Sequence, residues 1–313
     1  MAKKSRVPAA LMIDDGAPVN LMHWHCPWEA HERLIPNRLA KEFAELCERH
    51  GVMGKFSVVP MPAALGRIDG RLVGVPAAHL RGFLDIVRGR IAPRFDITPE
   101  LLTHLVAFDP SDGFQHVYED VWVAQASADE IADYIAFALK LLAKVGLKAN
   151  GVTSPWDTGG RNERTYAEGI GRAFARVQRR KTSWYFRTVA DGKPLWPSVA
   201  WQDRKRGLKV ISVPVNAGDV LWRTQYGSVA AARRAAKRCV DQLLSADGKS
   251  GRVRELVDAE APVTILTHWQ SLFSNGRMAG LAGLKLLLER MTKHLAGQIK
   301  WMRCSELAKL ARQ

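Results

Sequence analysis

Long apolar runs, cysteine pairs and the short motifs of several large enzyme classes are all missing from this sequence. No window approaches the roughly 18 consecutive apolar residues that a membrane helix needs, so we expect no membrane span. The four cysteines are scattered and include no Cys-x-x-Cys pair, which argues against a disulfide scaffold or a structural zinc module. No Gly-x-Ser-x-Gly elbow and no glycine-rich phosphate loop occurs, which disfavours a serine nucleophile and a nucleotide site.

Acidic residues are scarce relative to basic ones. The 313 residues include 46 Lys and Arg against 31 Asp and Glu, a formal net charge of +15. Much of the positive charge alternates with apolar residues at helical spacing, and no DNA- or RNA-binding motif accompanies it. We therefore expect a basic surface or attraction to an anionic substrate, and no nucleic-acid ligand. Because no secretory signal precedes the first apolar run, we expect a cytoplasmic protein; the oligomeric state stays open.

Helical and extended patterns alternate along the whole chain. Residues 37–50 carry apolar side chains on one face and stop at Gly51, and a capping box of Ser127 and Glu130 opens a long helix that reaches Val145. Short apolar runs between the helices are typical of parallel strands buried on both faces. The sequence therefore predicts an α/β fold in one domain, residues 1–313: a distorted or incomplete (β/α) barrel of about seven parallel strands.

The first predicted strand ends on two adjacent carboxylates. The apolar run at 10–13 stops at Asp14 and Asp15, followed by Gly16. Two like charges this close are costly unless a cation or a shared proton lies between them. A strand end followed by a plain Asp-Gly turn is the alternative, and the residues at the other strand ends favour a functional site.

Other predicted strands also end in residues that carry chemistry. The residues just past these strands are His104, Thr153, Trp156, His268 and Trp269. In α/β barrels such strand ends gather at one mouth. A carboxylate and imidazoles suit zinc or a similar transition metal, a second carboxylate can take a proton from water, and a histidine can protonate a leaving group. The pattern favours a metal-dependent hydrolase.

In order and spacing over residues 8–270, these pieces resemble the polysaccharide deacetylases (carbohydrate esterase family 4, the chitooligosaccharide-deacetylase homology domain). The resemblance implies that Asp14 is the base, Asp15 a metal ligand and His268 the general acid. It also implies that His104 is the first of two metal-binding histidines four residues apart. The implied activity is removal of an acetyl group from an amide or ester of a small molecule or oligosaccharide. The implied cofactor is a divalent transition metal, with zinc as the first choice.

The sequence departs from the family pattern at two places. Phe108 stands four residues after His104, so the second histidine is missing from its expected position. A longer segment with a turn at Asp112-Gly113 precedes Ser127, and we expect it to return a third metal ligand, His116 or, as the alternative, Glu119. Thr153 stands where the family has an arginine that orients the base.

The loop at 20–28 allows further interpretations. It contains His23 and His25 among tryptophans, a composition that suits a sugar-binding wall together with Trp156, Trp269 and Thr153. A His-x-His after a first barrel strand also resembles metal-dependent amidohydrolases that cleave C–N bonds, in which His23 and His25 would be ligands. The remaining alternative is a barrel with an eroded site that binds carbohydrate or an anionic ligand without catalysis.

Overall fold

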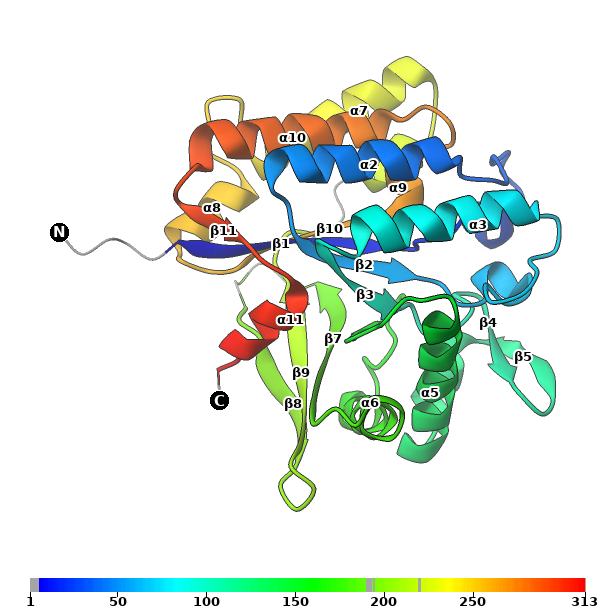
Figure 1. The fold of residues 1–313 in the computed structure, drawn as a ribbon. Helices are drawn as coiled ribbons and strands as arrows, with labels where there is room; N and C mark the ends of the chain where they lie inside the picture. Colours follow the sequence, from blue (N-terminus) through cyan, green and yellow to red (C-terminus); the bar gives the residue numbers. More distant parts are fainter. Residues whose placement is uncertain (1–5, 190–192, 194, 219–220, 313) are drawn as a thin grey trace.

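The structure is a computed structural model that describes residues 6–189, 193, 195–218 and 221–312. Its strands form two larger sheets and one separate hairpin (Figure 1). The first sheet has the order β10-β1-β2-β3, with β11 also paired to β1, and the second has the order β6-β7-β9-β8. The strands of the first sheet are β1 (Val7–Asp14), β2 (Gly54–Val58), β3 (Phe95–Pro99), β10 (Val263–His268) and β11 (Ile299–Trp301). Those of the second are β6 (Val152–Thr153), β7 (Thr182–Val189), β8 (Ser198–Asp203) and β9 (Leu208–Val215).

Isolated bridges connect the two sheets. Glu100 pairs with Thr153 between the ends of β3 and β6, and Ala217, just after β9, pairs with Ile265 of β10. The path β1-β2-β3-β6-β7-β9-β10 is parallel at every step, whereas β8 runs antiparallel to β9. The predicted fold class is confirmed: the chain forms an α/β barrel that is incomplete, since single bridges replace continuous ladders at two places.

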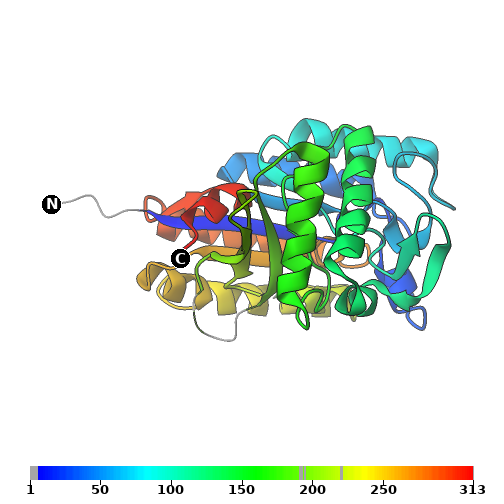
Figure 2. The same cartoon turned by 90° about the horizontal axis from the view of Figure 1, so that it is seen from below.

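Helices cover the outer faces of both sheets. Figure 1 shows one group above the first sheet: α2 (Asn37–His50), α3 (Ala77–Ile86) with the π-helical turn η2 (Val87–Ile91), α7 (Val229–Leu243) and α10 (Ala279–Leu295). The pair α5 (Ala128–Lys144) and α6 (Glu163–Gln178) flanks the second sheet, as Figure 2 shows from below. The predicted capping box is present, because Ser127 and Glu130 bond each other's backbone N–H. Among the described residues, no helix combines the length and apolar character needed to cross a membrane.

The side chains of β1 that point into the barrel form an inner row, and this row changes from apolar to polar along the strand. Leu11 and Ile13 pack outward among the helices, whereas Ala10 and Met12 belong to a second cluster inside the barrel. Asp14 continues this inner row, because side chains alternate along a strand. The inner apolar cluster extends to α11 (Cys304–Leu307), which covers the end of the barrel opposite Asp14. The α11 end of the barrel is therefore filled by apolar side chains, whereas the other end presents the polar groups that follow Met12 in this row.

The longer segment before Ser127 forms a hairpin and a short helix. They are β4 (Val106–Asp109), β5 (Gly113–Tyr118) and α4 (Glu119–Gln125). The predicted turn at Asp112-Gly113 is present, and Gly113 has a positive φ of 87°, which glycine adopts without strain. Figure 1 shows this hairpin projecting to one side of the barrel. The remaining short elements are α1 (Met22–His25), η1 (Pro62–Ala64), η3 (Trp222–Gln225), α8 (Arg252–Asp258), α9 (Trp269–Phe273) and η4 (Ala308–Leu310).

Candidate functional site

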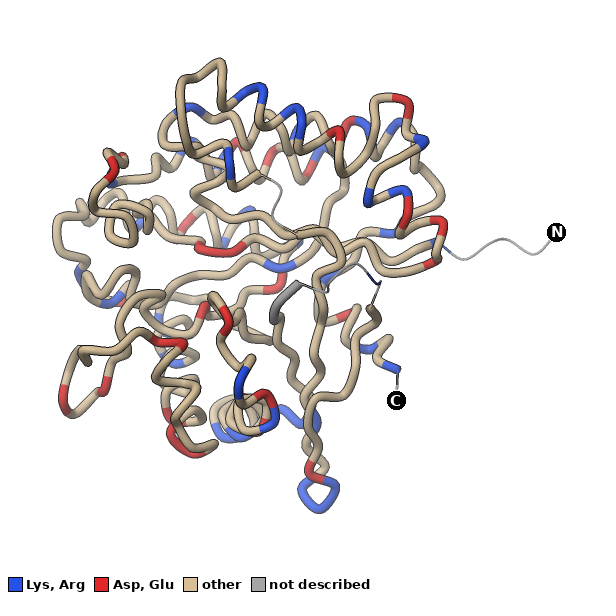
Figure 3. Tube along the Cα trace, turned by 180° about the vertical axis from the view of Figure 1, so that it is seen from behind, with Lys and Arg blue, Asp and Glu red and all other residues tan. Residues whose placement is uncertain are grey.

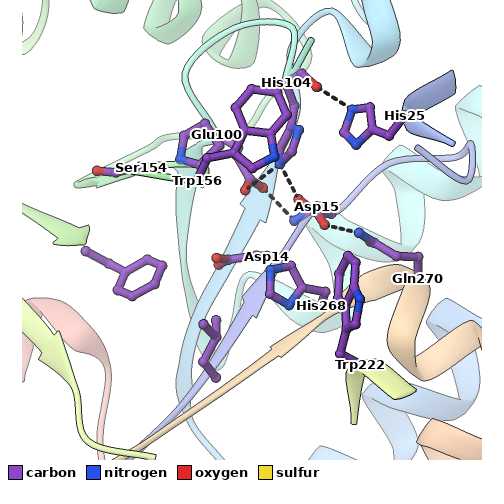
Figure 4. Close-up of a pocket in the computed structure, with 13 residues that line it drawn as sticks. Asp14, Asp15, His25, Glu100, His104, Ser154, Trp156, Trp222, His268 and Gln270 are labelled. Carbon is purple, nitrogen blue, oxygen red and sulfur yellow. Dashed lines mark hydrogen bonds and ion pairs between the residues drawn. The ribbon is translucent and has the colours of Figure 1, made fainter. Parts of the chain in front are cut away.

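A cavity of about 230 Å³ lies where the inner row becomes polar (Figure 4). Each of the four predicted strand ends contributes to its wall, through Asp14, His104, Trp156 and His268. The carboxyl ends of parallel strands are expected to gather in this way. The lining residues are Asp14, Asp15, His25, Glu100, His104, Ser154, Pro155, Trp156, Phe186, Trp222, Leu266, His268 and Gln270. Residues distant in sequence thus meet in one concave site.

Three buried side chains at this cavity form a cluster of metal-ligating type. One ligand atom from each of Asp15, Glu100 and His104 lies within 4.8 Å of the others. His104 Nε2 is 2.9 Å from Asp15 Oδ1 and 3.5 Å from Glu100 Oε1. Glu100 Oε2 accepts hydrogen bonds from Asp15 N at 2.5 Å and from Ser57 Oγ at 2.6 Å, and Gln270 Nε2 donates to Asp15 Oδ2. Both carboxylates are therefore held in place from outside the cluster.

The backbone around the cluster adopts uncommon conformations. Asp15, Leu101, His104 and Trp156 have positive φ angles of 64°, 41°, 52° and 48°. Each such residue costs on the order of 1–3 kcal/mol, and these conformations concentrate at functional sites. These turns let the side chains of Asp15, after β1, and His104, after β3, meet across the end of the intervening strand β2.

Burial and mutual charge shift the pKa values of the cluster. Burial raises the pKa of Glu100, and the neighbouring Asp15 and Asp14 raise it further. Burial alone would also raise the pKa of Asp15, but His104 and then His268 outweigh it and hold that pKa well below its usual range. Burial opposes the charged form of His104 too, but Asp15 raises the pKa of His104 to about 9. One imidazolium thus neutralises part of the acidic charge of this site.

Asp14 lies beside the cluster and pairs with a lysine inside the barrel. Lys55 Nζ contacts Asp14 Oδ1 and donates to Thr153 Oγ1 at 2.7 Å, and Thr153 in turn lies 2.8 Å from Thr98 Oγ1. Lys55 is fully buried, with its ammonium 4.6 Å from the centre of the Phe186 ring. Burial raises the pKa of Asp14, whereas the charges of Lys55 and His268 oppose this rise. Lys55 therefore fixes the carboxylate and supplies its counter-charge.

His268 approaches Asp14 from the neighbouring strand. The two residues occupy the same level in the parallel pairing of β1 with β10. The ring of Trp222 meets His268 edge to face with centroids 5.0 Å apart. Figure 4 shows His268 and Asp14 on one side of the cavity and His104 on the other. A substrate group between them would contact all three.

Two of the expected substrate-binding residues line the cavity. Trp156 is 44% exposed and packs against the rings of His104 and His25, with centroid distances of 4.5 and 5.5 Å. His25 Nε2 bonds the carbonyl of His104 at 2.7 Å. Burial, followed by the charge of His104, lowers the pKa of His25 to about 4. Thr153 lies beneath the cavity, bonded to Lys55 as described above.

Other expected site residues lie elsewhere. His116 is exposed on β5, within the hairpin that projects from the barrel, and is not part of the metal-ligating cluster. His23 bonds the carbonyl of His31 at 3.1 Å and does not line the cavity. Trp269 is fully buried against Phe43 and Phe56 on the outer face of the sheet, because it follows the inward-facing His268 by one residue.

Glu119 supports the loop that carries His104 and lies outside the cluster. Its carboxylate accepts hydrogen bonds from the backbone N–H groups of Leu102, Thr103 and His104 at 3.0, 2.8 and 2.7 Å. Tyr134 Oη donates a fourth at 2.5 Å, and Glu119 is fully buried. The carboxylate therefore holds the strained turn instead of offering its oxygens to the cavity.

Replacing this carboxylate tests its structural role. We expect Glu119→Gln to lower the free energy of unfolding by about 1–3 kcal/mol, because the amide NH₂ would face buried N–H donors and leave one of them unsatisfied. Glu130→Gln is the matched control, since glutamine also serves in a capping box and this site is exposed. Urea denaturation measures both variants. Equal stabilities of the two would contradict the assignment.

Several residues that line or underlie the cavity were not predicted from the sequence, among them Glu100, Lys55, Trp222 and Gln270. Glu100 lies four residues before His104, which is the spacing of the histidine pair in the family that the sequence resembles. The position four residues after His104 holds Phe108, which cannot bind a metal. A lysine within the apolar run at 55–59 was the available signal for Lys55. Trp222 and Gln270 carried no signal of their own.

Of the comparisons with known proteins, the one with solved structures supports the fold. No protein-family model and no curated protein matches the sequence. Among solved structures, a Mycobacterium smegmatis protein assigned as a polysaccharide deacetylase aligns with 100% of this chain and 93% of its own, at a TM-score of 0.55 and 12% identity. The chain has the polysaccharide deacetylase fold. The resemblance found in the sequence is thereby confirmed for the architecture.

A second structure in this group belongs to a protein described as a pseudoenzyme. It is a CE4 family pseudoenzyme from Bacillus anthracis, aligned over 99% of this chain and 68% of its own, at a TM-score of 0.44 and 10% identity.

Proposed function

We propose that this protein is a metal-dependent hydrolase that removes an acetyl group from an amide or ester of a carbohydrate. The observation that supports it is the meeting of Asp15, Glu100 and His104 in one cavity with Asp14 and His268. Ligands for a metal, a candidate base and a candidate acid are thus presented to the same space. The fold alone would not carry this proposal, because one fold serves many chemistries.

The cluster fits a divalent transition metal. Asp15 and Glu100 bring two buried carboxylates together, which is costly unless positive charge lies between them. Asp15 Oδ1 has no hydrogen-bond partner among the described residues, although His104 Nε2 lies 2.9 Å from it. One imidazole nitrogen and two carboxylates form a donor set that zinc accepts, and three protein ligands are typical of catalytic zinc. We therefore assign Asp15, Glu100 and His104 as the ligands, with Glu100 in place of the expected His116 or Glu119. When bound, the ion would supply Lewis acidity.

The proton transfers are assigned to Asp14 and His268. Asp14 accepts a proton from the attacking water, and its raised pKa makes it a better base than an exposed carboxylate. Lys55 holds the carboxylate in one orientation, the task that falls to an arginine in the family that the sequence resembles. His268 protonates the departing amine or alcohol. Trp156 and His25 form the wall against which a sugar would pack.

Acetate release with and without metal tests the proposal. We expect the purified protein to bind about one equivalent of zinc and to release acetate from N- or O-acetylated oligosaccharides, since three donors form one site. Chelation should abolish release, and added zinc should restore it. Acetate release that persists without metal would contradict the metal assignment. Oligosaccharide binding without any acetate release would favour the non-catalytic binding barrel.

A further inference from the structure

A second cavity opens beside His268. Its volume is about 720 Å³, and its lining residues are Trp222, Arg223, Ala235, Arg238, Cys239, Gln242 and His268. Trp222 and His268 also line the first cavity, so the two spaces meet at these side chains. Figure 4 shows Trp222 packed beside His268, on the side away from His104. A molecule whose acetyl group reaches the cluster could therefore extend past Trp222 into this second space.

Two arginines give the second cavity its charge. Arg223, from η3, and Arg238, from α7, are both exposed, and neither guanidinium has an ion-pair or hydrogen-bond partner among the described residues. By contrast, Lys237, next to Arg238 in the sequence, bonds Asp241 at 2.8 Å. Among the residues that the structure describes, none of those lining this cavity is a carboxylate. Two uncompensated cations in one concavity attract an anion, and guanidinium forks match carboxylate and phosphate geometry.

We infer that Arg223 and Arg238 form a subsite for an anionic group on the carbohydrate substrate, a carboxylate or a phosphate, carried near the acetyl group. This inference rests on the proposed function. The half-buried ring of Trp222 offers an apolar surface for the sugar that links the two groups. The surface charge of the protein agrees with it: Figure 3 shows Lys and Arg over much of the molecule, including a continuous basic turn between β8 and β9. An anionic substrate would be drawn to such a surface.

The test compares neutral and anionic substrates. Suitable substrates are N-acetylglucosamine oligomers, an oligosaccharide of alternating glucuronate and N-acetylglucosamine, and a phosphorylated N-acetylglucosamine oligomer. We expect Arg223→Gln with Arg238→Gln to lower kcat/KM for the better anionic substrate about 10- to 100-fold more than for the neutral one, mainly through KM. The ratio between the two anionic substrates distinguishes carboxylate from phosphate.

Arg233→Gln with Arg234→Gln is the matched control. Both arginines are exposed on α7, the helix that also carries Arg238, and neither is among the residues that line the cavity, so the control removes the same charge. It should change kcat/KM less than about twofold, the small effect of distant screened charges. An equal loss of kcat/KM in the two double variants, or an equal loss for the neutral and the anionic substrate, would overturn the subsite.

Calorimetric binding separates this inference from the proposed function. If no substrate releases acetate, the proposed function fails, yet the affinity for the anionic oligosaccharides still reports on the subsite. Loss of that affinity in the Arg223 and Arg238 pair alone supports the subsite. Equal affinity for neutral and anionic oligosaccharides would overturn the subsite. So would a DNA oligonucleotide that binds more tightly than the oligosaccharides and is weakened equally by the two double variants.

Discussion

Asp14→Asn should lower the rate of acetate release about 10²- to 10⁴-fold, the range that a positioned general base contributes. Asparagine keeps the size of the side chain but cannot accept the proton of the attacking water. The zinc content should stay at the wild-type level, because the ligands are Asp15, Glu100 and His104. The measurement is kcat on the metal-loaded variant, with metal content determined on the same sample.

The ion pair with Lys55 requires a second variant. Removing the charge of Asp14 leaves the Lys55 ammonium buried without a counter-ion, and breaking a buried pair in this way costs about 3–5 kcal/mol. In Asp14→Asn combined with Lys55→Met both charges are gone, so stability should recover while the rate remains low. Asp133→Asn, at an exposed carboxylate on α5, should leave the rate unchanged. Wild-type turnover in both Asp14 variants would show the mechanism to be wrong.

The sequence was most informative where strands end. Parallel strands bring their carboxyl ends to one mouth, so apolar runs that stop at Asp14, His104 or His268 predicted residues that do line a common cavity. Gathering of the strand ends at one mouth requires only that strands and helices alternate along the chain, and the alternating sequence patterns indicate this order. The class of fold followed from the same evidence, although the antiparallel strand β8 and the hairpin β4–β5 did not.

The remaining site residues depend on which face of a strand or loop a side chain occupies. Trp269 follows His268 by one residue, and this single step places it outside the barrel. Lys55 reaches Asp14 only because of the register between β1 and β2, which the sequence does not display. The path of the backbone between Glu100 and His104 brings these two side chains together. His116, by contrast, remains on the projecting hairpin. Register and turn handedness are tertiary properties, and short local patterns do not encode them.

The assignment of Glu100 as a metal ligand has the second large expected effect. We expect Glu100→Ala to weaken zinc binding by more than about 100-fold, since even residues that only support a ligand contribute about 10- to 100-fold. Glu100→His should retain much of the affinity, because imidazole also binds zinc and the residue would stand four positions before His104. Competition with a chromophoric chelator on the metal-free protein measures the affinities without reference to catalysis.

His116→Ala distinguishes this ligand set from the one that the sequence predicts. His116 lies exposed on β5 and outside the cluster, so its removal should leave zinc affinity unchanged within about twofold, as for most surface substitutions. The reverse pattern, in which His116→Ala weakens zinc binding and Glu100→Ala does not, would mean that the hairpin folds back over the cavity when metal binds. The two buried carboxylates favour Glu100 as the ligand. Burial and then repulsion from Asp15 raise the pKa of Glu100, and a cation between Asp15 and Glu100 removes that repulsion.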